Sequence, residues 1–304
     1  MKTFFVVNPR SANGETGKRW PEYQARIARS IPEAAFGFTA GPMDAARLAR
    51  QALKDGYPRV VAVGGDGTIN EVTNGFFEND KAVDAQAVLG VLPRGTGGDF
   101  RKTFEWGLDL DENVARLAKN QSKPFDVGHL EFTGHDGKPG TRVFANICSF
   151  GVSGDIDAEV NKASKALGSF AFNVGSVKAL LKFSDPEVTV RFDGGPPERM
   201  KITMLAVANG RFFGGGLKVA PNADPYDGRF DVTVWSGFGA KDFVLKQSMM
   251  RDGRHVELPG TRIRTCTSVE AQSEKTVLID CDGEQPGRLP CKMKVLPAAI
   301  RLAV

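Results

Sequence analysis

A short apolar run that passes directly into a glycine-rich, acid-containing loop is the feature that most restricts the fold of this chain. Val60–Val63 is followed by Gly-Gly-Asp-Gly-Thr-Ile-Asn-Glu at 64–71, and then by a helical pattern. Glycines let backbone N–H groups approach phosphate oxygens closely, and the N-terminus of the next helix carries partial positive charge. Asp66 is suited to holding Mg²⁺, and Thr68 to donating a hydrogen bond to a phosphate oxygen. A tight turn would explain the glycines, but it would not require these polar residues together. The run predicts a phosphate-binding strand–loop–helix unit.

Residues 1–123 alternate strand and helix patterns, which predicts an α/β domain with a parallel sheet. The expected strands are 4–7, 35–39, 60–63 and 87–92, and the expected helices are 20–30, 45–54 with Asp44 as N-cap, and one after Thr68. The strand at 87–92 runs into a second glycine-rich loop, Pro-Arg-Gly-Thr-Gly-Gly-Asp-Phe at 93–100. Ligands of open α/β sheets bind beyond the carboxyl ends of the strands, so the polar loops after these strands should converge.

The pattern changes at residue 124, where short β-branched or alternating segments are separated by glycine, proline and aspartate. These segments are 126–133, 142–150, 187–193, 200–208, 230–235, 262–270, 275–281 and 292–296. Helical patterns interrupt them at 153–183 and 241–251. The sequence therefore predicts a mainly antiparallel β-sandwich over 124–291, with a last strand within 292–304 that returns to the first domain.

Composition limits the classes of protein that this chain can belong to. It has 304 residues, 41% hydrophobic and 25% charged, as expected for a globular enzyme of two domains. A net charge of +4 is too small to indicate a nucleic-acid partner. No apolar stretch reaches the ~18 residues that span a bilayer. The four cysteines lack metal-ligand spacing and fit a reducing compartment, so a cytoplasmic protein is expected.

Six short motifs, in this order along the chain, resemble those of the soluble bacterial diacylglycerol kinase and sphingosine kinase-like lipid kinase family. They are Asn8-Pro9-x-Ser11, Gly64-Gly65-Asp66-Gly67-Thr68-x-Asn70-Glu71, Pro93-x-Gly95-Thr96-Gly97-x-Asp99-Phe100, Phe125-Asp126-Val127-Gly128, Asp227-Gly228-x-x-Asp231 and Asp280-x-Asp282-Gly283-Glu284. The resemblance implies an ATP-binding α/β domain, a β-rich lipid-binding domain and an active site between them. It implies ATP- and Mg²⁺-dependent phosphorylation of a lipid hydroxyl, on diacylglycerol or a related lipid.

Two other functions stay open at this point. The Gly-Gly-Asp-Gly run is shared with NAD kinases and phosphofructokinases, so a kinase of a soluble metabolite such as NAD is an alternative. A non-catalytic regulator that binds a nucleotide or a lipid is another. Gly98 stands where the family commonly has asparagine, which leaves the nucleotide preference open.

The resemblance also assigns residues to the nucleotide and to metal ions. The expected nucleotide contacts are Asn8, Ser11, Thr39, Gly65, Asp66, Gly67, Thr68, Ile69, Asn70, Glu71 and Thr96. A water-linked magnesium network is expected at Asp66, Asp99 and Asp126. A structural metal is expected at the side chain of Asp227 and at backbone oxygens of Asp224 and Arg229. The alternatives are a helix N-cap for Asp99 and ordinary turns for the aspartates at 126 and 227.

Asp282-Gly283-Glu284 is the expected position of the catalytic base. Phosphoryl transfer to a hydroxyl needs an acceptor for the hydroxyl proton, and a nearby carboxylate can serve. The resemblance assigns this acceptor within the triplet; the sequence does not separate the two acids, although Glu284 is favoured. The alternative is a plain hairpin turn, because Asp-Gly is a strong hairpin signal.

The lipid side of the site is less specific in sequence. Lysines and large apolar residues alternate over 162–182, which suits contact with an anionic bilayer, although such a stripe is more often a core segment with a basic edge. The glycine-rich run at 209–216 is expected between strands near the lipid. The expected partner is a lipid substrate at the inner face of the membrane, reached by peripheral contact; a homodimer stays open.

Overall fold

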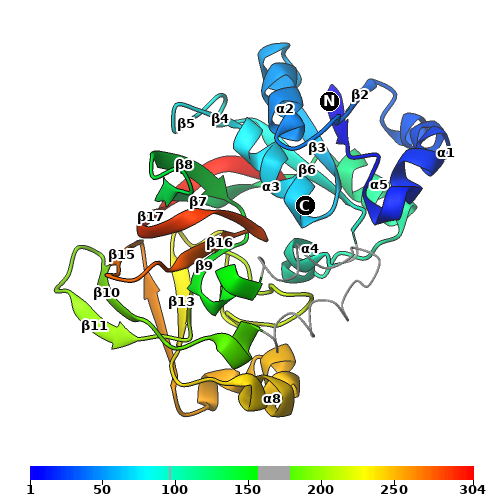
Figure 1. Cartoon of the computed structure of the whole chain (residues 1–304). Helices are drawn as coiled ribbons and strands as arrows, with labels where there is room; N and C mark the ends of the chain where they lie inside the picture. Colours follow the sequence, from blue (N-terminus) through cyan, green and yellow to red (C-terminus); the bar gives the residue numbers. More distant parts are fainter. Residues whose placement is uncertain (96, 157–178) are drawn as a thin grey trace.

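The structure is a computed structural model that describes residues 1–95, 97–156 and 179–304. Figure 1 shows helices gathered around the N-terminal strands and a strand-rich remainder below them. The strands are β1 Thr3–Val7, β2 Ala34–Phe38, β3 Arg59–Gly64, β4 Phe77–Glu78, β5 Lys81–Ala82, β6 Val88–Pro93, β7 Ser122–Gly134, β8 Pro139–Phe144, β9 Ile147–Gly151, β10 Glu187–Phe192, β11 Glu198–Lys201, β12 Met204–Ala208, β13 Phe230–Trp235, β14 Thr261–Cys266, β15 Ser268–Gln272, β16 Leu278–Cys281 and β17 Glu284–Ala303. The helices are α1 Glu15–Ser30, α2 Asp44–Lys54, α3 Asp66–Gly75, α4 Asp99–Thr103, α5 Leu110–Ala118 and α8 Ala240–Asp252, with 3-10 turns η1 Ala12–Gly14 and η3 Arg254–Glu257.

The N-terminal part is a parallel sheet in the order β2-β1-β3-β6. Successive side chains of a strand point to opposite faces, so the β-branched run of β3 supplies two separate cores. Val61 and Val63 pack with side chains of α1 and α5, whereas Val60 and Ala62 pack with side chains of α2 and α3. A sheet buried on both faces needs continuous apolar strands, and this is why the run at 60–63 does not alternate.

The C-terminal part is a β-sandwich. One layer contains β8, β7, β17, β15, β10 and β11, and the other contains β16, β9, β12, β13 and β14. Inward-facing side chains of both layers, among them Leu130, Phe150, Val207 and Met293, form one core. The outer face of β9, β12 and β13 is also buried, because α8 and neighbouring segments pack on it. The predicted α/β plus antiparallel sandwich architecture is therefore confirmed.

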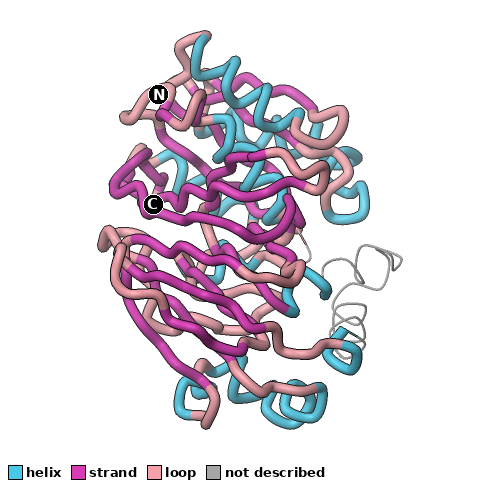
Figure 2. The backbone as a smooth tube through the Cα atoms, turned by 60° about the vertical axis from the view of Figure 1, so that its left-hand side comes forward, coloured by secondary structure: helices cyan, strands magenta, loops and turns pink. Residues whose placement is uncertain are grey.

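The long strand β17 joins the two parts. It pairs antiparallel with β7 along most of its length and with β15 and β16, and its end pairs parallel with β6 at Arg301 and Leu302. The strands consequently follow one another in a continuous stack through both parts, as Figure 2 shows. The predicted domain boundary at 123–124 falls inside β7, so no break in the sheet marks it.

Several predicted element boundaries were wrong. The first helix begins at Glu15, five residues earlier than predicted, directly after Gly14 in a left-handed conformation. The N-cap of α2 is Met43, and Asp44 is the first helical residue, where it accepts a hydrogen bond from the amide of Ala40. The predicted strand 142–150 is broken at 145–146. Most of the predicted helical region 153–183 lies outside the described residues.

Candidate active site

The loops after β3 and β6 touch each other. A Cβ on Gly95 would lie 2.6 Å from the Cα of Gly65, so this approach requires glycine. The carboxylate of Asp66 accepts hydrogen bonds from the amides of Asp99 and Phe100, both at 3.1 Å. The first helical turn of α3 is thereby fastened to α4, and the two glycine-rich loops form one surface.

The loop after β1 joins the same edge of the sheet. The side-chain amide of Asn8 donates to Thr68 Oγ1 at 3.0 Å, and Ser11 Oγ donates to the Asn8 carbonyl at 2.9 Å. Thr39 follows β2, and its amide donates to the carbonyl of Val7. The polar loops therefore meet beyond the carboxyl ends of the parallel strands, as predicted from the strand order.

Three further residues that were predicted to contact the nucleotide lie in α3, and their side chains contact other parts of the protein. Ile69 is buried in the core, and Glu71 accepts a hydrogen bond from the amide of Ala45 at 3.2 Å, which fastens α3 to the first turn of α2. Asn70 donates to the carboxylate of Asp282 at 2.8 Å. These contacts fasten α3 to the core, to α2 and to the turn at Asp282, and the predicted nucleotide contacts stay a prediction. Thr96, the predicted nucleotide contact of the second loop, lies outside the described residues.

The Asp282-Gly283-Glu284 turn lies against α3. Asp282 has φ of 52° and accepts four hydrogen bonds, from the side chain of Asn70 and from the amides of Ala145, Asn146 and Ile147. The break between β8 and β9 aims these amides at one carboxylate. Burial raises the pKa of Asp282, and the hydrogen bonds act in the opposite direction.

Glu284 has a different environment from Asp282. Its side chain is exposed, and Oε1 would lie 3.5 Å from a Cβ placed on Gly67 in the first glycine loop. Within the described part of the chain its carboxylate makes no hydrogen bond. The two acids therefore differ: Asp282 lines the cavity but has both oxygens engaged in hydrogen bonds, whereas Glu284 lies outside the cavity lining, near Gly67.

Asp66 is the residue that best fits a magnesium ion held with nucleotide phosphates. Such an ion keeps several waters and needs only one or two carboxylates. Asp66 lines the cavity described below, and each of its oxygens retains a lone pair. Burial, and secondarily the charge of Asp99, raise the pKa of Asp66. Among the described residues no group of three or more His, Cys, Asp or Glu is arranged around a common metal position.

The other two members of the predicted magnesium network differ from Asp66. The carboxylate of Asp99 binds Lys102 Nζ and the amide of Gly215, both at 2.7 Å. Asp126 accepts the amides of Gly228 and Ala298, both at 2.7 Å, and does not line the cavity. Burial raises the pKa of Asp126. The structure thus brings Asp66 and Asp99 together, and places Asp126 against a different loop.

That loop contains the predicted structural metal residues. Asp227 Oδ1 accepts the amide of Arg229 at 2.9 Å, and Asp224 Oδ1 accepts the amide of Tyr226 at 3.2 Å. Both aspartates therefore make turns of the kind that the alternative interpretation expected. Their role as metal ligands stays a prediction.

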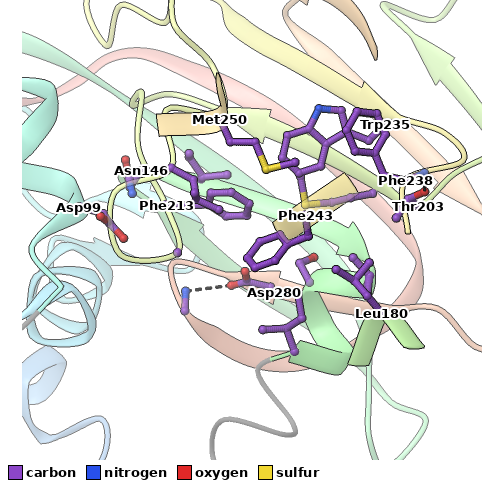
Figure 3. A pocket seen from close by; sticks show the side chains of 18 of the residues that line it. Asp99, Asn146, Leu180, Thr203, Phe213, Trp235, Phe238, Phe243, Met250 and Asp280 are labelled. Atoms are coloured by element: carbon purple, nitrogen blue, oxygen red, sulfur yellow. Dashed lines mark hydrogen bonds between the residues drawn. The ribbon is translucent and has the colours of Figure 1, made fainter. Parts of the chain in front are cut away.

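A cavity of about 220 Å³ extends from the glycine loops into the sandwich part. Its polar end is formed by Asp66, Asp99, Asp280 and Asp282. Its remaining wall is mainly apolar, and its larger members are Ile147, Ile156, Leu180, Met204, Phe213, Leu217, Trp235, Phe238, Phe243 and Met250. Figure 3 shows Asp99 on one side of the cavity and Trp235 with Phe238 on the opposite side. The space suits a molecule with a polar head and an apolar body.

Most of this wall was not predicted from the sequence. The run at 209–216 was expected near the lipid, and Phe213 and Gly214 do line the cavity. Trp235 and Phe243 lie on separate segments, and each follows a pattern that also fits ordinary core residues. Leu180 belongs to the stripe at 162–182, for which lipid contact was one of two interpretations. The basic and apolar stripe at 162–182 lies mostly outside the described residues.

The fold combines an α/β part, whose glycine-rich loops meet at one edge of the sheet, with a β-sandwich part, and a cavity beside these loops suits a phosphotransferase. Residues 2–130 match the family model described as the diacylglycerol kinase catalytic domain. Residues 146–304 match the model described as the YegS C-terminal NAD kinase beta sandwich-like domain. The chain belongs to the diacylglycerol kinase family that these two domains define.

Individual relatives agree with this assignment. A diacylglycerol kinase of Staphylococcus carnosus is 25% identical over 287 residues, which cover 94% of this chain and 89% of the relative. A crystal structure of a diacylglycerol kinase from Bacillus anthracis has a TM-score of 0.71 at 20% identity, covering 99% of this chain and 96% of its own. An NAD kinase from Archaeoglobus fulgidus, crystallised with ATP, has a TM-score of 0.53 at 14% identity and covers 99% and 93%. The two solved structures establish a shared fold.

Proposed function

We propose that this protein is an ATP- and Mg²⁺-dependent lipid kinase that transfers the γ-phosphoryl group of ATP to a hydroxyl of diacylglycerol or a related lipid. The observation that carries the proposal is the cavity, which has carboxylates at the glycine loops and an apolar wall beyond them. A soluble, highly polar acceptor would leave that wall without matching contacts, whereas hydrocarbon would bury it.

The loop amides, Asp66 and the Asp282-Gly283-Glu284 turn have separate roles in this proposed reaction. The amides of the first glycine loop and of α3 bind phosphate oxygens, and Asp66 holds the ion. Bound Mg²⁺ neutralises charge on the transferring phosphoryl group. The acceptor oxygen bonds to the γ-phosphorus as the bond from that phosphorus to ADP breaks, and Glu284 receives the hydroxyl proton. Asp282 holds the turn that carries Glu284 against α3.

The experiment that tests the proposal is label transfer from γ-labelled ATP, in the presence of Mg²⁺, to dispersed lipids that carry a free hydroxyl. Label in the lipid phase is expected for at least one of them. NAD in buffer without lipid tests the second candidate, an NAD kinase-like activity, which the fold shared with the Archaeoglobus protein favours. Label on NAD alone would contradict the proposal, and ATP binding without transfer to any acceptor would indicate a regulator.

Contact with the membrane surface is part of the proposal. Among the described residues no helix is long and apolar enough to cross a bilayer. In the part of the chain that the structure describes, however, the three most exposed large apolar side chains are Leu245 at 78%, Leu181 at 74% and Val244 at 60%. Their chain neighbours Phe243 and Leu180 line the cavity. Exposed Lys182, Lys241 and Arg251 accompany them, which suits an anionic lipid surface.

A further inference from the structure

The segment 210–217, Gly-Arg-Phe-Phe-Gly-Gly-Gly-Leu, forms one wall of the acceptor cavity through Phe213, Gly214 and Leu217. Gly214, Gly215 and Gly216 have φ of 59°, 77° and 110°, a left-handed run that side chains rarely adopt. Such a run has little conformational preference of its own, so contacts with neighbouring elements must hold its shape.

The short helix α4 supplies contacts at both of its ends. Asp99, its first residue, accepts a hydrogen bond from the amide of Gly215 at 2.7 Å. Thr103, its last residue, accepts one from the amide of Arg211 at 2.9 Å. The side chain of Asp99 is 9% exposed, and Lys102 fixes its other oxygen at 2.7 Å. Segment 210–217 is therefore attached to α4 by two side chains of that helix.

The backbone of α4 contacts Asp66, which lies in the first glycine loop at the predicted phosphate site. The amides of Asp99 and Phe100 donate to the two carboxylate oxygens of Asp66. One residue, Asp99, thus binds Asp66 through its amide and the cavity wall through its carboxylate. A shift of Asp66 or of the second glycine loop must move α4, and with it the amide of Gly215.

We propose that Asp99 is a positioning residue that couples the two substrate sites: it holds segment 210–217 in the shape that receives the acceptor when the phosphate loops are occupied. The inference rests on the proposed function for the identity of the two substrates. It gives the Asp99 carboxylate a role other than the magnesium contact expected from the sequence. Lys102 neutralises the charge of this carboxylate, and the amide of Gly215 donates a hydrogen bond to it.

The kinetic test compares variants that lose one attachment each. Asp99→Ala removes the contact with Gly215, and Thr103→Val removes the contact with Arg211 while keeping the side-chain volume. Asp99→Asn keeps an oxygen that can accept from Gly215, so it should recover part of the loss. Asp109→Ala is the matched control, because that aspartate also accepts a backbone amide, from Glu112 at 2.9 Å, but caps the distant helix α5.

We expect the variants to change the KM for the lipid but not the KM for ATP. In Asp99→Ala and Thr103→Val the KM for the lipid should rise about tenfold, as for the loss of one strong hydrogen bond, while the KM for ATP changes by less than about twofold. The control should change neither value. A lowered kcat with a changed Mg²⁺ dependence and an unchanged lipid KM in Asp99→Ala would overturn the proposal in favour of a metal role. An unaffected lipid KM in Thr103→Val would also overturn it.

A second measurement is independent of lipid turnover. Amide hydrogen exchange in peptides that cover 210–217 is measured with and without a non-hydrolysable ATP analogue. The analogue should slow exchange in this segment of the wild-type protein and leave it unchanged in Asp99→Ala. Peptides that cover 64–71 report whether the analogue binds, so failure of the proposed ATP site is distinguished from failure of coupling. Slower exchange at 64–71 with no effect at 210–217 in the wild-type protein would contradict the coupling.

Discussion

At the scale of single residues, Asp66 is the side chain on which the phosphate chemistry depends most. Asp66→Asn keeps the size of the side chain but removes the charge that would hold Mg²⁺, so lipid phosphorylation should fall by about 10²–10³-fold. One of the two backbone hydrogen bonds to Asp66 is lost in the asparagine variant, which should cost about 1–3 kcal/mol, and the rest of the fold should survive. Label transfer and circular dichroism on the same preparation check both points. The matched control Asp136→Asn, at an exposed turn, should keep full activity, and near-normal turnover of Asp66→Asn would contradict the assignment.

The two acids of the catalytic turn should respond differently to loss of charge. Glu284→Gln should leave ATP affinity nearly intact and reduce transfer by about 10²–10⁴-fold, the usual range for a positioned base. Asp282→Asn should mainly destabilise the fold, by about 1–3 kcal/mol, because an amide nitrogen would face a buried backbone donor. Calorimetric ATP binding, label transfer and thermal unfolding separate these outcomes. Full activity in Glu284→Gln would reduce the turn to a structural hairpin.

At the scale of elements, α8 has one face in the cavity and the other exposed. Burial of a leucine side chain contributes about 1.5–3 kcal/mol, so Leu245→Glu should weaken binding to anionic phospholipid vesicles by at least about tenfold. Leu108→Glu changes an exposed leucine, at 46%, outside this face and serves as the control. Vesicle sedimentation without ATP measures both. Equal losses in the two variants, or no loss in either, would remove α8 from the membrane contact.

The turn η3 after α8 carries a buried histidine that should make stability depend on pH. His255 binds the carbonyl of Val219 at 3.1 Å, and burial lowers its pKa. The unfolded chain therefore binds a proton that the folded chain does not, and stability should fall as the pH drops through about 6.5. Thermal unfolding at about pH 7.5 and about pH 5.5 brackets this window. The His255→Gln variant should lose less stability between these two pH values than the wild-type protein does. An equal loss of stability would show that other groups cause the pH dependence.

Across the whole molecule, the sequence predicted those features whose contacts lie within one short segment, and it missed those that depend on contacts between distant segments. The strand and glycine loop at 60–71 could be predicted because strand, turn and helix preferences there lie within one short segment. The opposite case is Asp282, whose Asp-Gly signal predicted a turn but not the four donors that Asn70 and residues 145–147 direct at it. Those donors come from segments more than a hundred residues away in the chain, and only the sheet topology brings them together.

The cavity wall could not be predicted either, because it is built by residues from distant segments. Trp235, Phe243 and Leu180 are buried apolar residues that belong to the same cluster as ordinary core residues, so residue type alone does not distinguish a cavity wall from core packing. The space exists because α8 and segment 210–217 do not close completely over β9, β12 and β13. Incomplete packing of this kind is a property of the assembled elements, and no short stretch of sequence encodes it.

The most direct test of the central claim is a chain-length series of acceptors with one constant hydroxyl headgroup, used at concentrations where each is monomeric. Each methylene buried in the apolar cavity contributes about 0.8 kcal/mol, so kcat/KM should rise about fourfold per added CH₂ until the cavity is filled, and then level off. The KM for ATP should stay constant through the series. A kcat/KM that does not depend on chain length would show that the cavity does not hold the body of the acceptor, and would contradict the assignment as a lipid kinase.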